Sequence, residues 1–481
     1  MPCDARAIVG RSAACFKCSG LGAVAIIASL VAVPACAAYA VPRGAIKQLR
    51  GRAGCAKTDQ FGRPREGCAA ARGLAWLGGD LAISPDGRNV YVASFGQNEL
   101  GSEREAIAVF ARDPHTGRLD QLAGGRGCLA RTRMKGCSAP FERGGFAMTG
   151  VVVSPDGRNV YVGSAWGLMA FARDRDTGAL TQLPGELACA EARSSPAPDD
   201  CDLGQNFVEF RPSPISVSGD GRSIYLGGER GITLFSRDPA TGGLTRRARF
   251  AKGRAARETA LAGDGTSAYT STVHRYVGVF ARAPSGELTD AGCVGTRRGC
   301  RPARGIGRTQ AIAVSPDDRH VYATSVRCIG GGTGEECDAI FGNIGIYRRN
   351  RATGRLTQLR GKAGCIDDRP RVADCAPGYA IASPSALTVS HDGRNVYVGA
   401  DANGAISVFH RNRRRGRLRQ LPGRAGCAQV ARARVDGWTV LRRCARARGL
   451  GSVDAVEGTG DGRNVYAFSG SGLVAFSRRS R

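Results

Sequence analysis

Short apolar runs recur along the chain, and each is bounded by glycine, proline or aspartate. The stretch from Gly150 to Leu183 shows the pattern most clearly, because VVV, VYV, LMAF and LTQL alternate there with Pro-Asp-Gly, a glycine-containing loop and Asp-Thr-Gly. Runs of this length that are rich in β-branched and aromatic residues predict strands, and the residues between them predict turns. The stretch therefore predicts a sheet of four strands.

This four-stranded unit occurs seven times. Its turn aspartates are Asp86, Asp156, Asp220, Asp264, Asp317, Asp392 and Asp461, and the tyrosines five residues later are Tyr91, Tyr161, Tyr225, Tyr269, Tyr322, Tyr397 and Tyr466. The arginines that follow the third strand are Arg112, Arg173, Arg237, Arg282, Arg349, Arg411 and Arg478. Seven such sheets around an axis predict an all-β fold, the seven-bladed β-propeller. Residues used in every blade should serve packing, and we expect partly exposed Asp–Arg contacts worth about 0–1 kcal/mol each.

The two ends of the chain predict how the ring closes. The sequence IKQL from Ile46, followed by GRAGC, matches the fourth-strand signatures that begin at Leu356 and Leu418, whereas the last repeat stops after its third strand, which ends near Arg478. The N-terminal segment should therefore provide the outer strand of the last blade.

Residues 1–40 carry the features of a secretory signal peptide. Arg6, Arg11 and Lys17 precede an apolar run over residues 21–33, and an Ala-x-Ala cleavage site ends at Ala40. We expect residues 41–481 to form one exported domain that is extracellular, periplasmic or at the cell surface. A lipoprotein anchored at Cys36 is the alternative.

The fourteen cysteines after residue 40 fall into seven close pairs: Cys55/Cys68, Cys128/Cys137, Cys189/Cys201, Cys293/Cys300, Cys328/Cys337, Cys365/Cys375 and Cys427/Cys444. An even number in local pairs on an exported chain predicts disulfides. Metal binding is the alternative, but no pair has the CxxC spacing of a zinc site.

The formal net charge of +28 favours loose association with an anionic polymer of the cell envelope. The chain has no nucleic-acid recognition motif, so we expect no specific nucleic-acid partner. We also expect a monomer.

Strand order separates the loops onto two ends of the propeller. The short turns lie at one end, and the long connections with the cysteine pairs lie at the other, which is where a rigid scaffold usually carries function. His274 and Arg275 fall in a loop at this second end. The histidines His115, His320, His391 and His410 map to the end with the short turns, where we expect surface positions.

The units VVVSPDGRNVYVGS, LMAFARDRDTGALTQL and AISVFH resemble the seven-bladed lactonase family, which includes 6-phosphogluconolactonase-like and YVTN-type surface propellers. The resemblance covers about residues 45–481. It implies lactone ring opening, or its reverse in muconate-lactonizing relatives, by His, Arg and Glu side chains on the loop face. His274 could then activate water and Arg275 could stabilise the oxyanion, with Glu209 or Glu229 assisting; exposed loop residues without a role are the alternative.

Residues six or seven positions before each turn aspartate should surround the mouth of a central channel: Asp80, Thr149, Ser213, Glu258, Gln310, Ser385 and Asp454. Most of these are candidate ligand-binding residues, and Trp166 could stack on a sugar. We expect no cofactor, although three carboxylates near one axis could hold Ca²⁺. Asp80 and Asp454 sit one register apart, however, and strand alternation could point them in different directions.

Three functions remain open on the sequence. The first is a binding or scaffold module that recognises an unknown protein or an envelope polymer, such as an anionic glycan. The second is a lactone hydrolase that uses a loop-face pocket. The third is polyanion binding by surface arginines such as those of residues 411–419.

Overall fold

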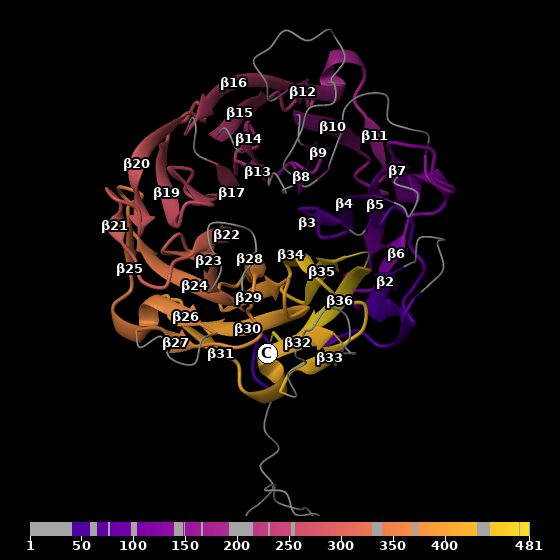
Figure 1. The fold of residues 1–481 in the computed structure, drawn as a ribbon. Helices are drawn as coiled ribbons and strands as arrows, with labels where there is room; N and C mark the ends of the chain where they lie inside the picture. Colours follow the sequence, from indigo (N-terminus) through magenta and orange to yellow (C-terminus); the bar gives the residue numbers. More distant parts are fainter. Residues whose placement is uncertain are drawn as a thin grey trace, which may run out of the picture. The chain divides into compact units, whose positions relative to one another are not determined.

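The computed structural model describes residues 41–57, 65–75, 77–97, 103–138, 148, 150–164, 167–191, 215–228, 231–251, 255–329, 339–368, 374–430, 443–470 and 472–480. Seven small antiparallel sheets form a ring within the unit Pro42–Arg481 (Figure 1). The seven-bladed propeller predicted from the repeats is confirmed. No helix in these ranges is long and apolar enough to cross a membrane.

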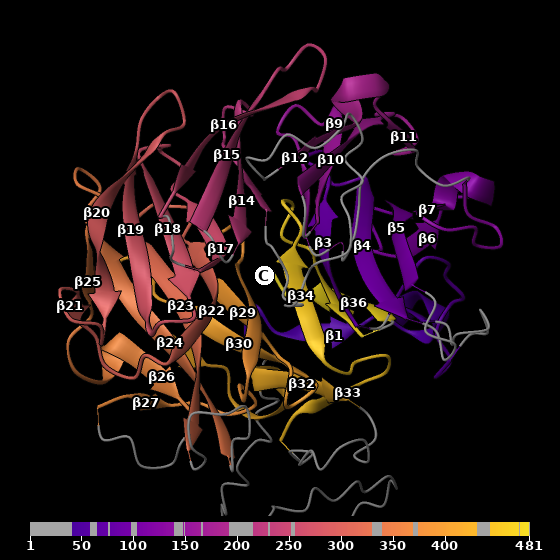
Figure 2. The same cartoon turned by 45° about the horizontal axis from the view of Figure 1, so that its top comes forward.

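Each blade is built outward from an inner strand. The inner strands are β3 (Gly78–Ile83), β8 (Gly150–Val153), β13 (Ile215–Val217), β17 (Ala256–Leu261), β22 (Arg308–Val314), β28 (Pro384–Val389) and β34 (Val453–Gly458). The second strands are β4 (Asn89–Gln97), β9 (Asn159–Gly163), β14 (Ser223–Gly228), β18 (Ser267–Thr272), β23 (His320–Ile329), β29 (Asn395–Ala400) and β35 (Asn464–Ser469). The third strands are β5 (Glu103–Arg112), β10 (Gly167–Arg173), β15 (Gly231–Arg237), β19 (Tyr276–Arg282), β24 (Ala339–Arg349), β30 (Ala405–Arg411) and β36 (Gly472–Arg478). We number the blades 1 to 7 in this order, and Figure 2 shows their strands standing side by side around the ring.

The outer strand is continuous in blades 3 and 4, as β16 (Leu244–Phe250) and β20 (Leu288–Gly295), and is broken in the other five. The broken strands are β6 (Leu119–Gln121) with β7 (Cys128–Ala130), β11 (Leu180–Gln182) with β12 (Cys189–Glu191), β25 (Leu356–Gln358) with β26 (Cys365–Asp367), β31 (Leu418–Gln420) with β32 (Cys427–Val430), and β1 (Ile46–Gln48) with β2 (Cys55–Lys57). The 3₁₀ helices between the two pieces are η1 (Gly51–Gly54), η2 (Gly124–Gly127), η3 (Gly185–Ala188), η4 (Gly361–Gly364) and η5 (Gly423–Gly426). Three short strands, β21 (Arg301–Pro302), β27 (Ala376–Pro377) and β33 (Ala445–Ala447), pair in parallel with the outer strands of blades 4, 5 and 6.

The break follows from the repeated Q-L-x-G-x-x-G/A-C sequence. In blade 7, Gly51 has a φ of 58°, which favours glycine and turns the chain into the helix. The Gln48 side chain then donates a hydrogen bond to the Gly54 carbonyl at 3.0 Å and fixes the turn. The sequence predicted one outer strand per blade, and this local chemistry divides it.

The N-terminal segment closes the ring as predicted. Strand β1 pairs with β36 in the register Ile46↔Arg478 and Gln48↔Phe476, and β2 pairs with the same strand through Cys55↔Val474. The last blade is therefore shared between the two ends of the described chain.

A repeated cluster of buried polar side chains joins neighbouring blades. In the cluster between blades 1 and 2, Arg173 donates to Asp86 at 2.9 Å and to the Tyr91 hydroxyl at 2.7 Å. Equivalent ion pairs join Arg237 to Asp156, Arg282 to Asp220, Arg349 to Asp264, Arg411 to Asp317, Arg478 to Asp392 and Arg112 to Asp461. The contacts predicted from the repeat exist, but each crosses a blade boundary. The aspartate side chains are 22–43% exposed, as expected, whereas the arginine side chains are only 0–5% exposed, so the arginine half of each pair is buried.

His320 differs from its prediction for the same reason. It is 2% exposed, because it occupies the buried place that Asn89 has in blade 1, and its Nδ1 lies 2.9 Å from the Arg411 guanidinium. Burial and the charge of Arg411 lower the pKa of His320 to about 4, so the imidazole is neutral at pH 7. His115, His391 and His410 are exposed, as expected.

Five of the predicted disulfides are present: Cys55–Cys68, Cys128–Cys137, Cys293–Cys300, Cys365–Cys375 and Cys427–Cys444. Cys189 is also disulfide-bonded. Predictions for residues 1–40 and for Thr149, Trp166, Cys201, Glu209, Ser213, Glu229 and Cys337 lie outside the described residues.

Candidate functional site

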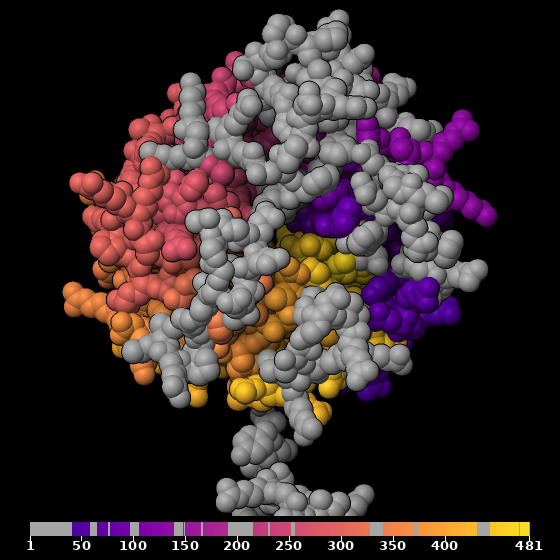
Figure 3. All heavy atoms as spheres, viewed as in Figure 1, coloured from indigo at the N-terminus to yellow at the C-terminus, as the bar shows by residue number. Residues whose placement is uncertain are grey.

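Four carboxylates lie on the inner strands of blades 1, 4 and 7. Asp80 belongs to β3, Glu258 to β17, and Asp454 and Glu457 to β34, and all four are partly buried. In Figure 3 the indigo residues of the first blade and the yellow residues of the last meet near the middle of the ring. We call Asp80, Glu258, Asp454 and Glu457 the axial cluster.

Three members of the axial cluster link neighbouring inner strands. Asp80 Oδ2 accepts a hydrogen bond from the Val151 N–H at 3.1 Å, and Glu457 Oε2 accepts one from the Ile83 N–H at 3.1 Å. Glu258 Oε2 accepts from the Ile312 N–H at 2.9 Å. The free edge of an inner strand has no ladder partner, so these carboxylates satisfy backbone groups there.

Burial changes the acidity of the axial cluster. It raises the pKa of Asp80 to about 6 and that of Asp454 to about 7. It also raises the pKa of Glu258 and of Glu457 to about 8. The negative charge of Asp80 contributes to the rise in the pKa of each of the other three groups, so each of them lies within electrostatic reach of Asp80. At pH 7 the axial cluster therefore contains both protonated and ionised carboxyl groups.

Four inner strands are irregular at residues that the sequence predicted to face the channel. The pairing register shifts in β17 around Glu258, in β22 around Gln310, in β28 around Ser385 and in β34 around Asp454. An extra residue in one strand redirects the side chains around it, and such bulges are frequent beside functional sites. Strand β3 pairs regularly through Asp80. The shift in β34 compensates for the one-residue offset between Asp80 and Asp454, so the two lie within electrostatic reach.

Two predicted ligand-binding residues, Gln310 and Ser385, form side-chain hydrogen bonds across blade boundaries. Arg257, the residue before Glu258, donates a hydrogen bond from its guanidinium to the Gln310 side-chain oxygen of the next blade. The Ser385 hydroxyl likewise donates to the Val453 carbonyl across a blade boundary. Gln310 and Ser385 were predicted to bind a ligand, and the structure gives both a role in joining blades.

Two residues of this region, Glu457 and Arg257, were not predicted from the sequence. Glu457 lies four residues before its turn aspartate and Asp80 lies six before its own, so the two share the same strand parity. This shared parity could have identified Glu457 as a second inner-strand carboxylate from the sequence. Arg257 stands in an Arg/Ala-rich run, which gave no reason to single it out.

His274 and Arg275 are the residues that the sequence predicted to activate water and to stabilise the oxyanion. Both are exposed in the turn between β18 and β19, and the His274 ring stacks on Tyr276 with ring centroids 6.5 Å apart. Arg297 covers the same tyrosine at 5.3 Å. No hydrogen bond between described residues joins His274 or Arg275 to the axial cluster, so their predicted catalytic role stays a prediction.

The donor set does not fit a calcium ion. Asp80, Glu258 and Glu457 each use one oxygen to accept a backbone N–H, and Glu258 and Glu457, whose pKa values are raised to about 8, hold protons at pH 7. Within the described ranges, no group of three or more His, Cys, Asp or Glu side chains has the arrangement of a metal site.

Replacing Glu457 by Gln should stabilise the protein more at pH 9 than at pH 5. A carboxyl group whose pKa is raised on folding contributes stability below its unfolded pKa and loses it as the pH rises through the folded value, here about 8. A glutamine oxygen can still accept from Ile83, but it carries no charge. We expect Tm to rise by roughly 2 °C or more at pH 9 and to change little at pH 5. The exposed Glu287→Gln is the control, and an equal shift at both pH values would contradict the argument.

One protein-family model matches part of the chain. The model of the family "Lactonase, 7-bladed beta-propeller" matches residues 228–429. The matched segment contains blades 4 to 6 almost entire, with Arg257, Glu258 and Gln310, whereas Asp80 and Asp454 lie outside it. No curated protein matches the chain significantly.

Several solved structures are similar to this chain at low sequence identity. The Pseudomonas aeruginosa periplasmic gluconolactonase PpgL has 16% identity and a TM-score of 0.47, with 78% of this chain and 93% of that chain covered. A Lactobacillus plantarum protein has 15% identity, a TM-score of 0.48, and coverage of 79% and 94%. Kuenenia stuttgartiensis hydrazine synthase has 13% identity, a TM-score of 0.46, and coverage of 87% and 100%.

Proposed function

We propose that the protein is a lactone hydrolase that opens its substrate at the axial cluster. One observation carries this proposal: two acids of the cluster, Asp80 and Glu258, have pKa values of about 6 and about 8, on either side of neutrality, and Arg257 precedes Glu258. Acid–base catalysis works best with groups whose pKa values lie near the working pH. The lactonase-family match supports the same reaction.

In the proposed reaction, ionised Asp80 accepts a proton from a water molecule as the water oxygen bonds to the lactone carbonyl carbon. Arg257 stabilises the negative charge that develops on the carbonyl oxygen. The ring C–O bond then breaks, and the departing oxygen takes the proton of the Glu258 carboxyl group. The product is an open-chain hydroxy acid, and proton exchange with water restores both carboxyl groups.

A panel of γ- and δ-lactones tests the proposal. We expect Asp80→Asn to lower kcat/KM by about 10²-fold or more, because an amide cannot take the proton from water. The exposed Glu287→Gln should leave the rate unchanged, and the wild-type rate should fall below about pH 6 as Asp80 becomes protonated. If His274→Ala abolishes turnover and Asp80→Asn does not, the reaction belongs to the loop between β18 and β19. Absence of turnover by the wild type on the whole panel would reject the enzyme in favour of a binding or scaffold role.

Export of the protein is part of this proposal. The described disulfides favour an oxidising compartment. Together with the predicted signal peptide, they support a periplasmic, extracellular or cell-surface location. Mass spectrometry of the protein from cell fractions should find a new N-terminus near Val41, and an unprocessed cytoplasmic chain would contradict export.

A further inference from the structure

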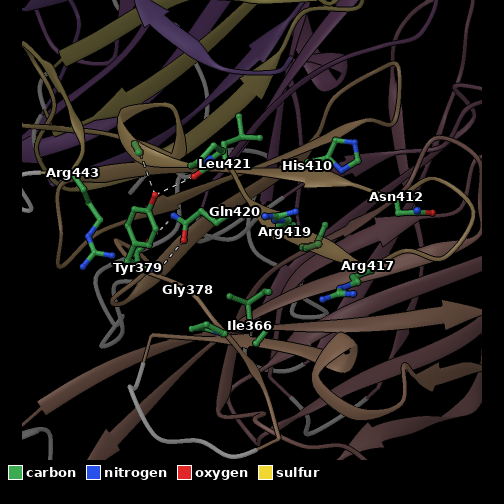
Figure 4. A pocket seen from close by; sticks show the side chains of 15 residues that line it. Ile366, Gly378, Tyr379, His410, Asn412, Arg417, Arg419, Gln420, Leu421 and Arg443 are labelled. Atoms are coloured by element: carbon green, nitrogen blue, oxygen red, sulfur yellow. Dashed lines mark hydrogen bonds between the residues drawn. The ribbon is translucent and has the colours of Figure 1, made fainter. Parts of the chain in front are cut away.

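A hollow of about 940 Å³ lies at the outer edge of the ring, between blades 5 and 6 (Figure 4). Ile366 and the chain from Ala376 to Tyr379 line one side, and residues of β30 and β31 line the other. A second hollow, of about 330 Å³, shares His410 and Arg419 with the first and extends to Arg43 beside the closing strand. We call the two hollows together the rim groove.

The rim groove combines an apolar floor with cationic walls. Among its described lining residues none is Asp or Glu, while His410, Arg417, Arg419 and Arg443 are all exposed. Figure 4 shows Arg443 and Tyr379 at one end of the larger hollow and Arg417 at the other, with Arg419 between them. The charged groups are thus distributed along the length of the groove.

Bonds within the groove hold its aromatic ring in place. The Tyr379 hydroxyl donates to the Leu421 carbonyl at 3.1 Å, and Gln420 bonds to the Tyr379 backbone at 2.9 Å and 3.0 Å. The Arg443 guanidinium lies 4.6 Å from the centre of the tyrosine ring. Since Gln420 and the hydroxyl are used in this way, arginine and histidine N–H groups are the main donors left to face a ligand.

We propose that the rim groove binds an acidic polysaccharide whose sugars carry carboxylates. Guanidinium groups pair with carboxylates through two parallel hydrogen bonds, and the C–H faces of sugars pack on apolar surface. The carboxylates of such a chain would therefore bind the arginines of the walls, and its sugar rings would pack on the apolar floor. Single-stranded nucleic acid fits less well, because it needs several stacking rings. The described lining has two, Tyr379 and His410, and Arg443 partly covers the tyrosine. An added peptide strand fits less well, because β31 is three residues long and Pro422 follows shortly after it.

Binding of an oligogalacturonate chain to the full-length protein tests this site, measured by calorimetry at about 0.15 M salt, where the Debye length is about 8 Å. The double variant Arg417→Ala/Arg419→Ala should weaken binding by at least about tenfold. The matched control is Arg351→Ala/Arg355→Ala, which removes two exposed arginines from the equivalent region of blade 5, outside the groove. We expect the control to bind like the wild type, and Tm should confirm that both variants are folded.

Two further ligands identify the chemistry. The methyl-esterified oligogalacturonate keeps the sugars and loses the charge, so it should not bind, and dextran sulfate should bind more weakly than the uronate. Equal losses in the two double variants would overturn the proposal in favour of diffuse surface charge. Tighter binding of a single-stranded oligonucleotide, weakened by the same groove variant, would overturn it in favour of nucleic acid.

Discussion

Replacing Arg411 by alanine should lower the free energy of unfolding by about 3–5 kcal/mol, because removing one member of a buried ion pair leaves the other groups without their partner. Arg411 is 1% exposed and bonds to both carboxylate oxygens of Asp317, at 2.8 Å and 3.0 Å. It also donates to the Tyr322 hydroxyl at 2.7 Å and to the Gly393 carbonyl at 2.8 Å. Denaturant unfolding would measure the loss.

Arg282→Ala provides the graded comparison. Its partner Asp220 has a side chain that is 43% exposed and lies 3.5 Å away, the longest of the seven equivalent ion pairs. Because water can solvate that aspartate in the variant, we expect a clearly smaller loss than for Arg411→Ala. Equal losses would mean that the volume of the arginine, and not its ion pair, stabilises the blade boundary.

Ile46→Asp should open the ring and lower the free energy of unfolding by about 3–5 kcal/mol. Ile46 is 7% exposed and packs in the core shared by the last two blades, so an aspartate there loses apolar contacts and buries a charge. Denaturant unfolding and the rate of limited proteolysis would both report the change.

Lys47→Asp is the matched control for this strand. Lys47 is the next residue of β1 and keeps the same pairing with β36, but its side chain is exposed. It introduces the same carboxylate on the solvent side and reverses a charge. A comparable loss of stability in the two variants would show that charge, and not closure of the core, determines the effect.

The sequence predicted the fold because each repeat encodes its own turns and strands. Asp156-Gly157 and Asp176-Thr177-Gly178 bound strands within one blade, and IKQL could be recognised as an outer strand by comparison with its copies. Local spacing does not reveal which blade an arginine reaches. The same repeat allows Arg173 to pair within its own blade or with Asp86 of the preceding one, and only the packed ring distinguishes the two.

The candidate site was predicted in part. Asp80, Glu258 and Asp454 were found by counting back from the turn aspartates, but counting assumes regular strands. The register shifts in β17 and β34 break the two-residue alternation, so the relative placement of Asp454 and Asp80 could not be derived from spacing. His320 was misplaced for a related reason: its position in the repeat is usually asparagine, and burial there depends on a neighbouring blade.

The clasp between blades, an arginine of one unit on an aspartate of the unit before it, has a direction. Each blade contributes its arginine to the preceding blade and its aspartate to the following blade. Arg112 of blade 1 pairs with Asp461 of blade 7 in the same sense as the rest. A duplicated repeat would carry both the arginine and the aspartate, so it would form the same ion pairs with its two neighbouring blades. The clasp therefore joins neighbouring blades without determining how many blades there are. The number seven must be set by the angle at which neighbouring sheets pack.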